Sequence, residues 1–176
     1  MATCAIAGIV TLVILLIALA SNQIYPFGDK SLAIYDLEWQ YQSYFGWLSN
    51  VLHGQSSLFY SAAKGLGGGM FTLFAYYLSS PFNVLAFFFS PEQTPELIVV
   101  LTLLKIPTCA ITCAVFLTGR FADHINAIPD HLVIVLASVS YALCGCIGDY
   151  SSNLMWIDGY YMLPIVALGV YRLVSQ

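Results

Sequence analysis

The sequence predicts an all-α polytopic membrane protein: a bundle of about four spanning helices, with amphipathic or interfacial helices in the first external loop. Of the 176 residues, 60% are hydrophobic and only 8% are charged, whereas a soluble domain carries about 25% charged residues. Tyr and Phe, which are enriched at membrane interfaces, occur 12 and 11 times. The expected surroundings are therefore a lipid bilayer. The net charge of −4 includes no basic block, so nucleic acid is not an expected partner.

Four apolar runs are long enough to cross the hydrocarbon of a bilayer. We expect a single transmembrane domain over residues 1–176, with spans at about 2–20, 96–119, 131–148 and 159–174. The first run is about 28 Å long as a helix. Its end, Ala18-Leu19-Ala20 before Ser21, also fits a signal-peptidase site. Because the run lacks a basic start and exceeds the roughly 7–15 residues of a signal core, we interpret it as a retained span.

The expected external loop, residues 21–95, contains an amphipathic segment and a broken apolar segment. Apolar side chains recur at helical spacing on one face, and polar side chains occupy the other. The apolar set is Leu37, Tyr41, Tyr44, Phe45, Leu48 and Leu52, and the polar set is Asp36, Gln40, Ser43 and Asn50. This helix is expected to lie along the membrane surface and to stop at Gly54. In residues 70–89, Pro81 predicts two short helices rather than one straight span.

The orientation depends on whether residues 70–89 cross the membrane. If they do not, Arg120 and Arg172 lie on the side of the N-terminus, which is then cytoplasmic by the positive-inside rule. The acidic residues of the loops then emerge on the opposite face: Asp29, Asp36, Glu38, Asp149 and Asp158. If they do cross, both arginines lie outside, which the rule disfavours.

Two acids are candidates for chemistry. Asp36 is either an acid that complements the dipole of a helix start or a general base that takes a proton from an acceptor hydroxyl. Asp158 follows Trp156 just before the last span. In one interpretation Trp156 is an interfacial anchor and Asp158 a helix cap. In the other, Asp158 is a second carboxylate that orients an acceptor. Asp149 is a further candidate acid in the same loop.

Two lysines are candidates for binding an anion. Lys105 lies inside an apolar helix, where an unpaired charge costs roughly 2.5–3.5 kcal/mol. It either extends toward the outer interface or pairs with a buried carboxylate or a lipid phosphate. Lys64 precedes a glycine-rich stretch whose backbone N–H groups could cradle a phosphate, although the order of a P-loop is absent. The cysteines lie in apolar runs without accompanying His or carboxylate side chains, so we expect no metal site and no cofactor.

The chain resembles the N-terminal part of bacterial YfhO-type membrane proteins, which belong with the GT-C glycosyltransferases. The resemblance runs from about Pro26 to Leu173 and rests on the order and spacing of several short motifs. These are Pro26-Phe27-Gly28-Asp29, Asp36 with Gln40-Tyr41, Gly65-Leu66-Gly67-Gly68, Ser80-Pro81-Phe82-Asn83, Leu104-Lys105-Ile106, Ser140-Tyr141-Ala142-Leu143 with Gly145, and Asn153 with Met155-Trp156 and Asp158. Family members look several times longer, so we expect the chain to be an N-terminal fragment that is inactive by itself.

The resemblance implies a GT-C-like fold and a bacterial cell-membrane transferase. Such an enzyme moves a sugar from a polyprenyl-phosphate donor to a cell-envelope polymer or lipid acceptor, on the extracytoplasmic face. It implies catalytic roles for Asp36 and Asp158. Substrate-binding roles are expected for Lys105, Lys64, Gln40 and Trp156. The alternative is a non-enzymatic lipid transporter or envelope-assembly subunit, since interrupted helices and an intramembrane lysine are also typical of transporters.

Overall fold

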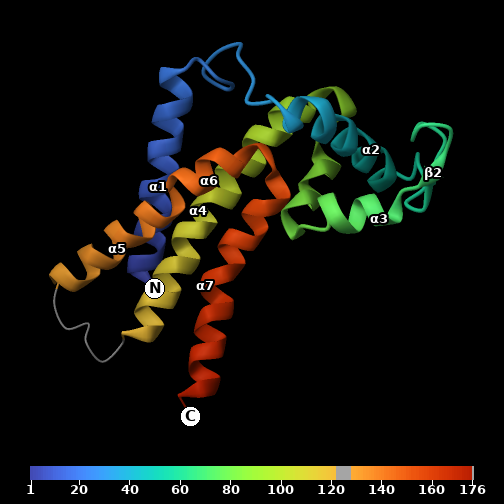
Figure 1. The fold of residues 1–176 in the computed structure, drawn as a ribbon. Helices are drawn as coiled ribbons and strands as arrows, with labels where there is room; N and C mark the ends of the chain where they lie inside the picture. Colours follow the sequence, from blue (N-terminus) through green and yellow to red (C-terminus); the bar gives the residue numbers. More distant parts are fainter. Residues whose placement is uncertain (122–127, 176) are drawn as a thin grey trace.

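The computed structural model describes residues 1–121 and 128–175, which form a bundle of helices with one small hairpin (Figure 1). The long helices are α1 (Ala2–Ser21), α4 (Thr94–Arg120), α5 (Ile128–Ala142) and α7 (Leu154–Val174). The short elements are η1 (Leu37–Tyr41), α2 (Gln42–Leu52), β1 (Tyr60–Ser61), β2 (Gly68–Gly69), α3 (Phe71–Leu73), η2 (Phe74–Leu78), η3 (Pro81–Phe88), η4 (Pro91–Gln93), α6 (Gly145–Asp149) and η6 (Tyr150–Ser152). The predicted all-α membrane bundle is confirmed.

Helix α4 is the centre of the bundle and packs against α1, α5 and α7 (Figure 1). Its inward face is fully buried at Leu97, Ile98 and Leu101. Gly8 allows α1 to approach closely, because a Cβ added there would lie 2.7 Å from a side-chain carbon of Ile111. The helix continues without a break through Pro107.

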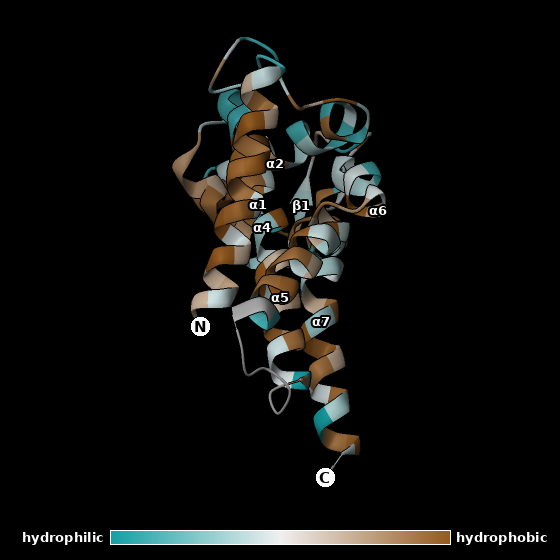
Figure 2. Cartoon of the chain, turned by 90° about the vertical axis from the view of Figure 1, so that its left-hand side faces the viewer, coloured by the Kyte–Doolittle hydropathy of each residue, from teal (hydrophilic) through white to brown (hydrophobic). Residues whose placement is uncertain are grey.

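Among the described residues, four helical segments are long and apolar enough to cross a membrane. They are Ala2–Ser21, Pro91–Arg120, Asp130–Ser152 and Leu154–Val174. Figure 2 shows mainly hydrophobic residues along these helices, with hydrophilic ones in the connecting loops and on helical turns near the two ends of the bundle. The last span begins earlier than the sequence suggested, since α7 starts at Leu154. Trp156 and Asp158 therefore lie inside its first turns, so Asp158 does not cap the helix.

The amphipathic segment of the first loop folds as η1 followed by α2, with the predicted apolar face turned inward. Tyr41, Phe45 and Leu48 on that face are at most 3% exposed. The Ser49 hydroxyl donates a hydrogen bond of 2.7 Å to the carbonyl of Phe89, at the end of η3. The helix stops as expected at Gly54, which has a φ of 72°.

The next segment bends sharply, as Pro81 predicted. The helical stretches Phe71–Leu78 and Pro81–Phe88 meet at 107°, and they would add a fifth span if they form a single broken crossing. Before them, β1 and β2 pair antiparallel, with Tyr60 opposite Gly69. In Figure 1 the hairpin, α2 and α3 gather on one side of the bundle, and the C-terminal end of α7 lies away from them.

Candidate functional site

The centre of the candidate site is a buried ion pair between α4 and α7. The Lys105 side chain is completely buried, and its Nζ lies 3.0 Å from Oδ1 of Asp158. The same ammonium donates to Oδ2 of Asp158 and to the carbonyl of Leu154, each at 3.1 Å. An ammonium has three protons to donate, and three acceptor atoms surround this one. Of the alternatives that the sequence left open for Lys105, the structure shows pairing with a partly buried carboxylate.

The bent segment joins this pair through Ser80. Its hydroxyl donates a hydrogen bond of 2.9 Å to Oδ1 of Asp158. Asp158 therefore links three parts of the chain that are distant in sequence: α4, α7 and the residue that precedes Pro81. In the sequence, Ser80 belonged to the Ser80-Pro81-Phe82-Asn83 motif and preceded the predicted break, but it was not among the predicted site residues. A polar residue next to the bend was the available signal, but its partner depends on tertiary structure.

Tyr41 connects the first loop to the start of α7. The residue is fully buried, and its hydroxyl accepts a hydrogen bond of 3.4 Å from the backbone N–H of Met155. Burial raises the pKa of the Tyr41 phenol well above its usual value, and the nearby carboxylates of Asp36 and Asp158 raise it further. Tyr41 is therefore a neutral hydroxyl that lies within electrostatic reach of both candidate acids.

Asp36 lies directly before η1 and is partly exposed. Its Oδ1 accepts a hydrogen bond of 3.4 Å from Nε2 of Gln40, one helical turn later. Within residues 1–121 and 128–175, no lysine or arginine forms a salt bridge with Asp36. The carboxylate is thus held by a weak contact and is accessible, as a proton acceptor must be.

A cleft of about 260 Å³ opens beside Asp36. The residues on both sides of Asp36, Tyr35 and Leu37, form part of its wall. Asp149 and Ser152 line the cleft as well. We call this cavity the polar cleft. It brings the segment that carries Asp36 together with the loop that precedes α7.

Lys64 and Trp156 lie apart from the ion pair. Lys64 is exposed, next to the tip of the β1–β2 hairpin, and its Nζ donates a hydrogen bond of 2.7 Å to the carbonyl of Gly69. Trp156 is 43% exposed, and its ring contacts that of Tyr150 with centroids 4.7 Å apart. Among the residues that the structure describes, neither side chain forms a hydrogen bond or salt bridge with Lys105 or Asp158. Of the predicted site residues, Lys105 contacts Asp158, and Asp36 separately contacts Gln40.

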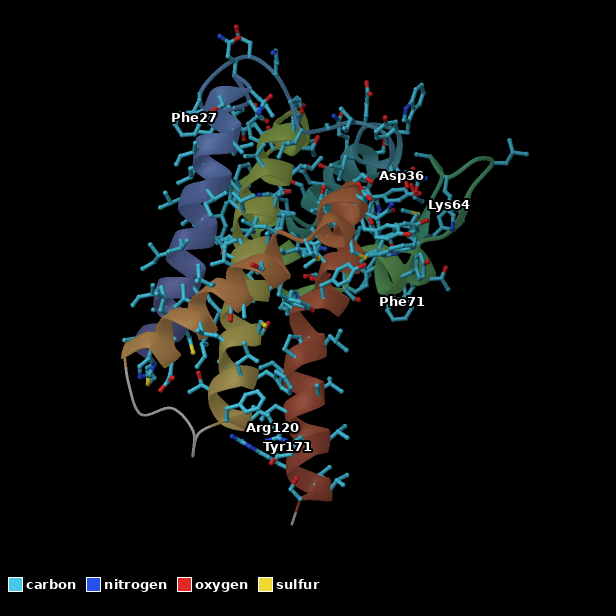
Figure 3. The ribbon with its side chains drawn as sticks, turned by 60° about the vertical axis from the view of Figure 1, so that its left-hand side comes forward. Phe27, Asp36, Lys64, Phe71, Arg120 and Tyr171 are labelled. Atoms are coloured by element: carbon cyan, nitrogen blue, oxygen red, sulfur yellow. The ribbon has the colours of Figure 1, made fainter. Side chains whose placement is uncertain are left out.

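Asp36 and Arg120 lie at opposite ends of the bundle. Figure 3 shows Asp36 and Lys64 on the side of the short helices, whereas Arg120 and Tyr171 lie at the other end. There the Arg120 guanidinium lies 4.2 Å from the centroid of the Tyr171 ring, which is a cation–π contact. This separation matches the sequence pattern that suggested the orientation. No group of three or more His, Cys, Asp or Glu side chains that could hold a metal occurs among the residues described.

Comparison with known proteins identifies the family. A family model described as "Bacterial membrane protein YfhO" matches residues 7–176. Since this match covers nearly the whole chain, the chain belongs to that family, and the resemblance seen in the sequence motifs is confirmed. No curated protein and no solved structure matches the chain.

Proposed function

We propose that this YfhO family member acts as part of a GT-C-type glycosyltransferase in the bacterial cell membrane, with its N-terminus in the cytoplasm. It would move a sugar from a polyprenyl-phosphate donor to a lipid or polymer of the cell envelope, on the extracytoplasmic face. The observation that carries this proposal is the accessible carboxylate of Asp36 beside the polar cleft. A general base needs such access, and the weak hydrogen bond from Gln40 leaves the carboxylate of Asp36 available to an acceptor hydroxyl.

The reaction follows from these positions. An acceptor hydroxyl that extends from the cleft to Asp36, which lies just outside the cleft wall, would lose its proton to Asp36, and its oxygen would attack the anomeric carbon of the sugar. The bond from that carbon to the phosphate oxygen breaks, and polyprenyl phosphate leaves with the electron pair. A nearby cation balances the charge on the leaving phosphate. The exposed indole of Trp156 offers an aromatic face on which a sugar ring can lie.

The two candidate lysines suit different roles. Lys64 is exposed and has one carbonyl partner, so its ammonium can turn to a phosphate at little cost. Lys105 has three acceptor atoms around it, and a phosphate would have to displace Asp158. We therefore assign the phosphate contact to Lys64, and to Lys105 a positioning role that acts through Asp158.

The test is transfer by the intact protein, reconstituted in liposomes with a radiolabelled polyprenyl-phosphate sugar and a total envelope-lipid extract. Asp36→Asn should lower the rate by about 10²–10⁴ while insertion and melting temperature persist, because a general base contributes that much. Glu38→Gln is the matched control, since Glu38 is an exposed acid two residues away. Full activity of Asp36→Asn would remove this residue from the mechanism.

A lipid transporter is the second candidate, favoured by the buried ion pair beside a sharply bent helix. Such a pair can exchange partners as a substrate passes. The discriminating measurement is movement of fluorescent lipids across liposomes that contain the protein but no sugar donor. Movement that Asp158→Asn abolishes and Asp36→Asn leaves intact would favour transport over transfer.

A further inference from the structure

A second cavity adjoins the polar cleft and differs from it in character. It has a volume of about 330 Å³ and lies between α1, α4 and the α5–α6 region. Four residues line both cavities: Leu32, Thr102, Gly148 and Ser151. The rest of its wall is apolar apart from Asn22, and consists of Leu15, Ala18, Leu19, Ile24, Leu103, Ile106, Ala142, Leu143 and Ile147. We call this cavity the apolar groove.

The apolar groove opens sideways from the bundle. Its floor is buried at Leu19, Ile106 and Ile147, whereas Ala18 and Leu143 on its rim are exposed. Both rim residues belong to segments that can span a membrane. An opening between two such segments faces hydrocarbon, so a lipid chain can enter it from the bilayer without crossing water.

The polar cleft continues the groove toward the loops. Its polar side chains include Tyr35, Asp149, Ser151 and Ser152, and none of the described residues that line either cavity is a lysine or arginine. Phosphate groups are bound in proteins by Arg, Lys or clustered N–H donors. A carboxylate without a cation repels a phosphate, but it accepts hydrogen bonds from hydroxyl groups. The charge of the cleft therefore favours an uncharged, hydroxyl-bearing headgroup.

We propose that the apolar groove and polar cleft together bind a membrane lipid whose headgroup is uncharged and rich in hydroxyl groups. Together the cavities fall in the range of about 300–1,000 Å³ that is typical of small-molecule sites. The headgroup lies against Tyr35 and Leu37, which flank Asp36. This inference rests on the proposed transferase function and gives the acceptor its chemical class: a neutral glycolipid, distinct from the phosphate-bearing donor.

The test measures lipid binding in phosphatidylcholine nanodiscs that contain the intact protein. Two probes with the same diazirine-bearing acyl chain are compared at equal mole fraction: a diglycosyl diacylglycerol and a phosphatidate. After irradiation, the adducts are mapped on peptides. The glycosyl probe should label peptides from residues 15–24 and 142–148 more strongly than phosphatidate does, and unlabelled diglycosyl diacylglycerol should compete.

Variants that fill the groove provide the control. Leu103→Trp should reduce groove labelling roughly tenfold, which corresponds to about 1.4 kcal/mol of binding free energy. Leu132→Trp makes the same substitution on an exposed position of α5 that lines neither cavity, and labelling should persist. If Leu103→Trp does not fold, Ala18→Trp blocks the exposed rim instead. Equal labelling in the groove-filling and control variants, or preference for phosphatidate, would overturn the proposal.

Binding and transfer can fail separately. Asp36→Asn should bind the glycosyl probe as the unmodified protein does, because Asp36 does not line either cavity. Selective binding in a protein without transferase activity would leave the lipid site in place and remove only the proposed reaction. Transfer that depends on Asp36, in a protein whose groove peptides take up no glycosyl probe, would remove only the lipid site.

Discussion

Lys105 and Asp158 form one ion pair but are buried to different extents: the lysine side chain is 0% exposed and that of the aspartate is 23% exposed. The two residues should therefore respond differently to substitution. Removing Asp158 leaves a charge that has no contact with water. Removing Lys105 leaves a carboxylate that is partly exposed and that Ser80 still contacts.

We predict that Asp158→Asn destabilises the protein more than Lys105→Met does. Breaking a buried pair and leaving the other charge in place typically costs about 3–5 kcal/mol, and that cost applies to the stranded Lys105. The measurement is thermal unfolding in detergent, followed by circular dichroism. The double variant Lys105→Met/Asp158→Leu should recover much of the loss, because neither charge remains. A larger loss in Lys105→Met than in Asp158→Asn would contradict the structural explanation.

Ser80→Ala should loosen the bent segment while leaving the bundle intact. A hydrogen bond to a charged group contributes about 1.5–3 kcal/mol, and the bond from Ser80 to Asp158 ties the bend to α7. Amide hydrogen exchange should rise in residues 74–88 and remain unchanged in α1. Ser79→Ala is the matched control, because the Ser79 hydroxyl is bound only within its own helix, to the carbonyl of Ala75. Equal exchange in the two variants would show that Ser80 does not hold the bend.

Tyr41 should make stability fall at alkaline pH. Burial raises the pKa of its phenol in the folded state, whereas in the unfolded chain the value is about 10. The folded state therefore favours the neutral form. The contribution of the neutral Tyr41 phenol to stability is complete below about pH 10. It is lost as the pH rises from about 10 toward the pKa of this phenol in the folded state. Tyr41→Phe should flatten this alkaline decline of the melting temperature, and Tyr76→Phe, at an exposed position, should not.

Topology can be tested with single cysteines on a Cys-free background. Leu66, fully exposed at the hairpin tip, should react as cysteine with an impermeant maleimide added outside intact cells. Ser175, just after α7, should react only after permeabilisation. The basis is the separation of Arg120 from Asp36 along the bundle (Figure 3) and the positive-inside rule. The reverse labelling pattern would invert the orientation and remove the extracytoplasmic reaction from the proposal.

The sequence predicted the helices well because apolar length and proline position act locally. The long apolar runs, the stop at Gly54 and the break before Pro81 each follow from one stretch of chain. The start of α7 was less predictable. The residues from Leu154 to Asp158 form a short apolar stretch that ends in an acid. Their helical structure is supported by contacts of Lys105 and Tyr41 with this turn.

The site was predictable only in part, for a similar reason. Because an unpaired buried charge is costly, a buried Lys105 needed an anionic partner. The sequence did not decide between a carboxylate and a lipid phosphate. Only the packing of α7 on α4 selects Asp158. For Lys64 the phosphate contact stays a prediction: composition suggested it, and the structure shows an exposed ammonium that donates to the carbonyl of Gly69. The loop from Arg120 to Asp130 is expected to be cytoplasmic because it begins with Arg120, and its residues 122–127 lie outside the described residues.

The distance in sequence between Lys105 and Asp158 has a consequence for biosynthesis. The two residues are 53 positions apart, so at about 5–20 residues per second a ribosome needs roughly 3–10 s to make the second after the first. During that interval α4 enters the membrane with its lysine unpaired, at a cost of roughly 2.5–3.5 kcal/mol. Helix α4 should therefore remain beside the translocon, or close to the lipid surface, until α7 arrives. Ribosomes arrested between these two positions would hold this intermediate, and crosslinks from α4 to the translocon would disappear once Asp158 has emerged.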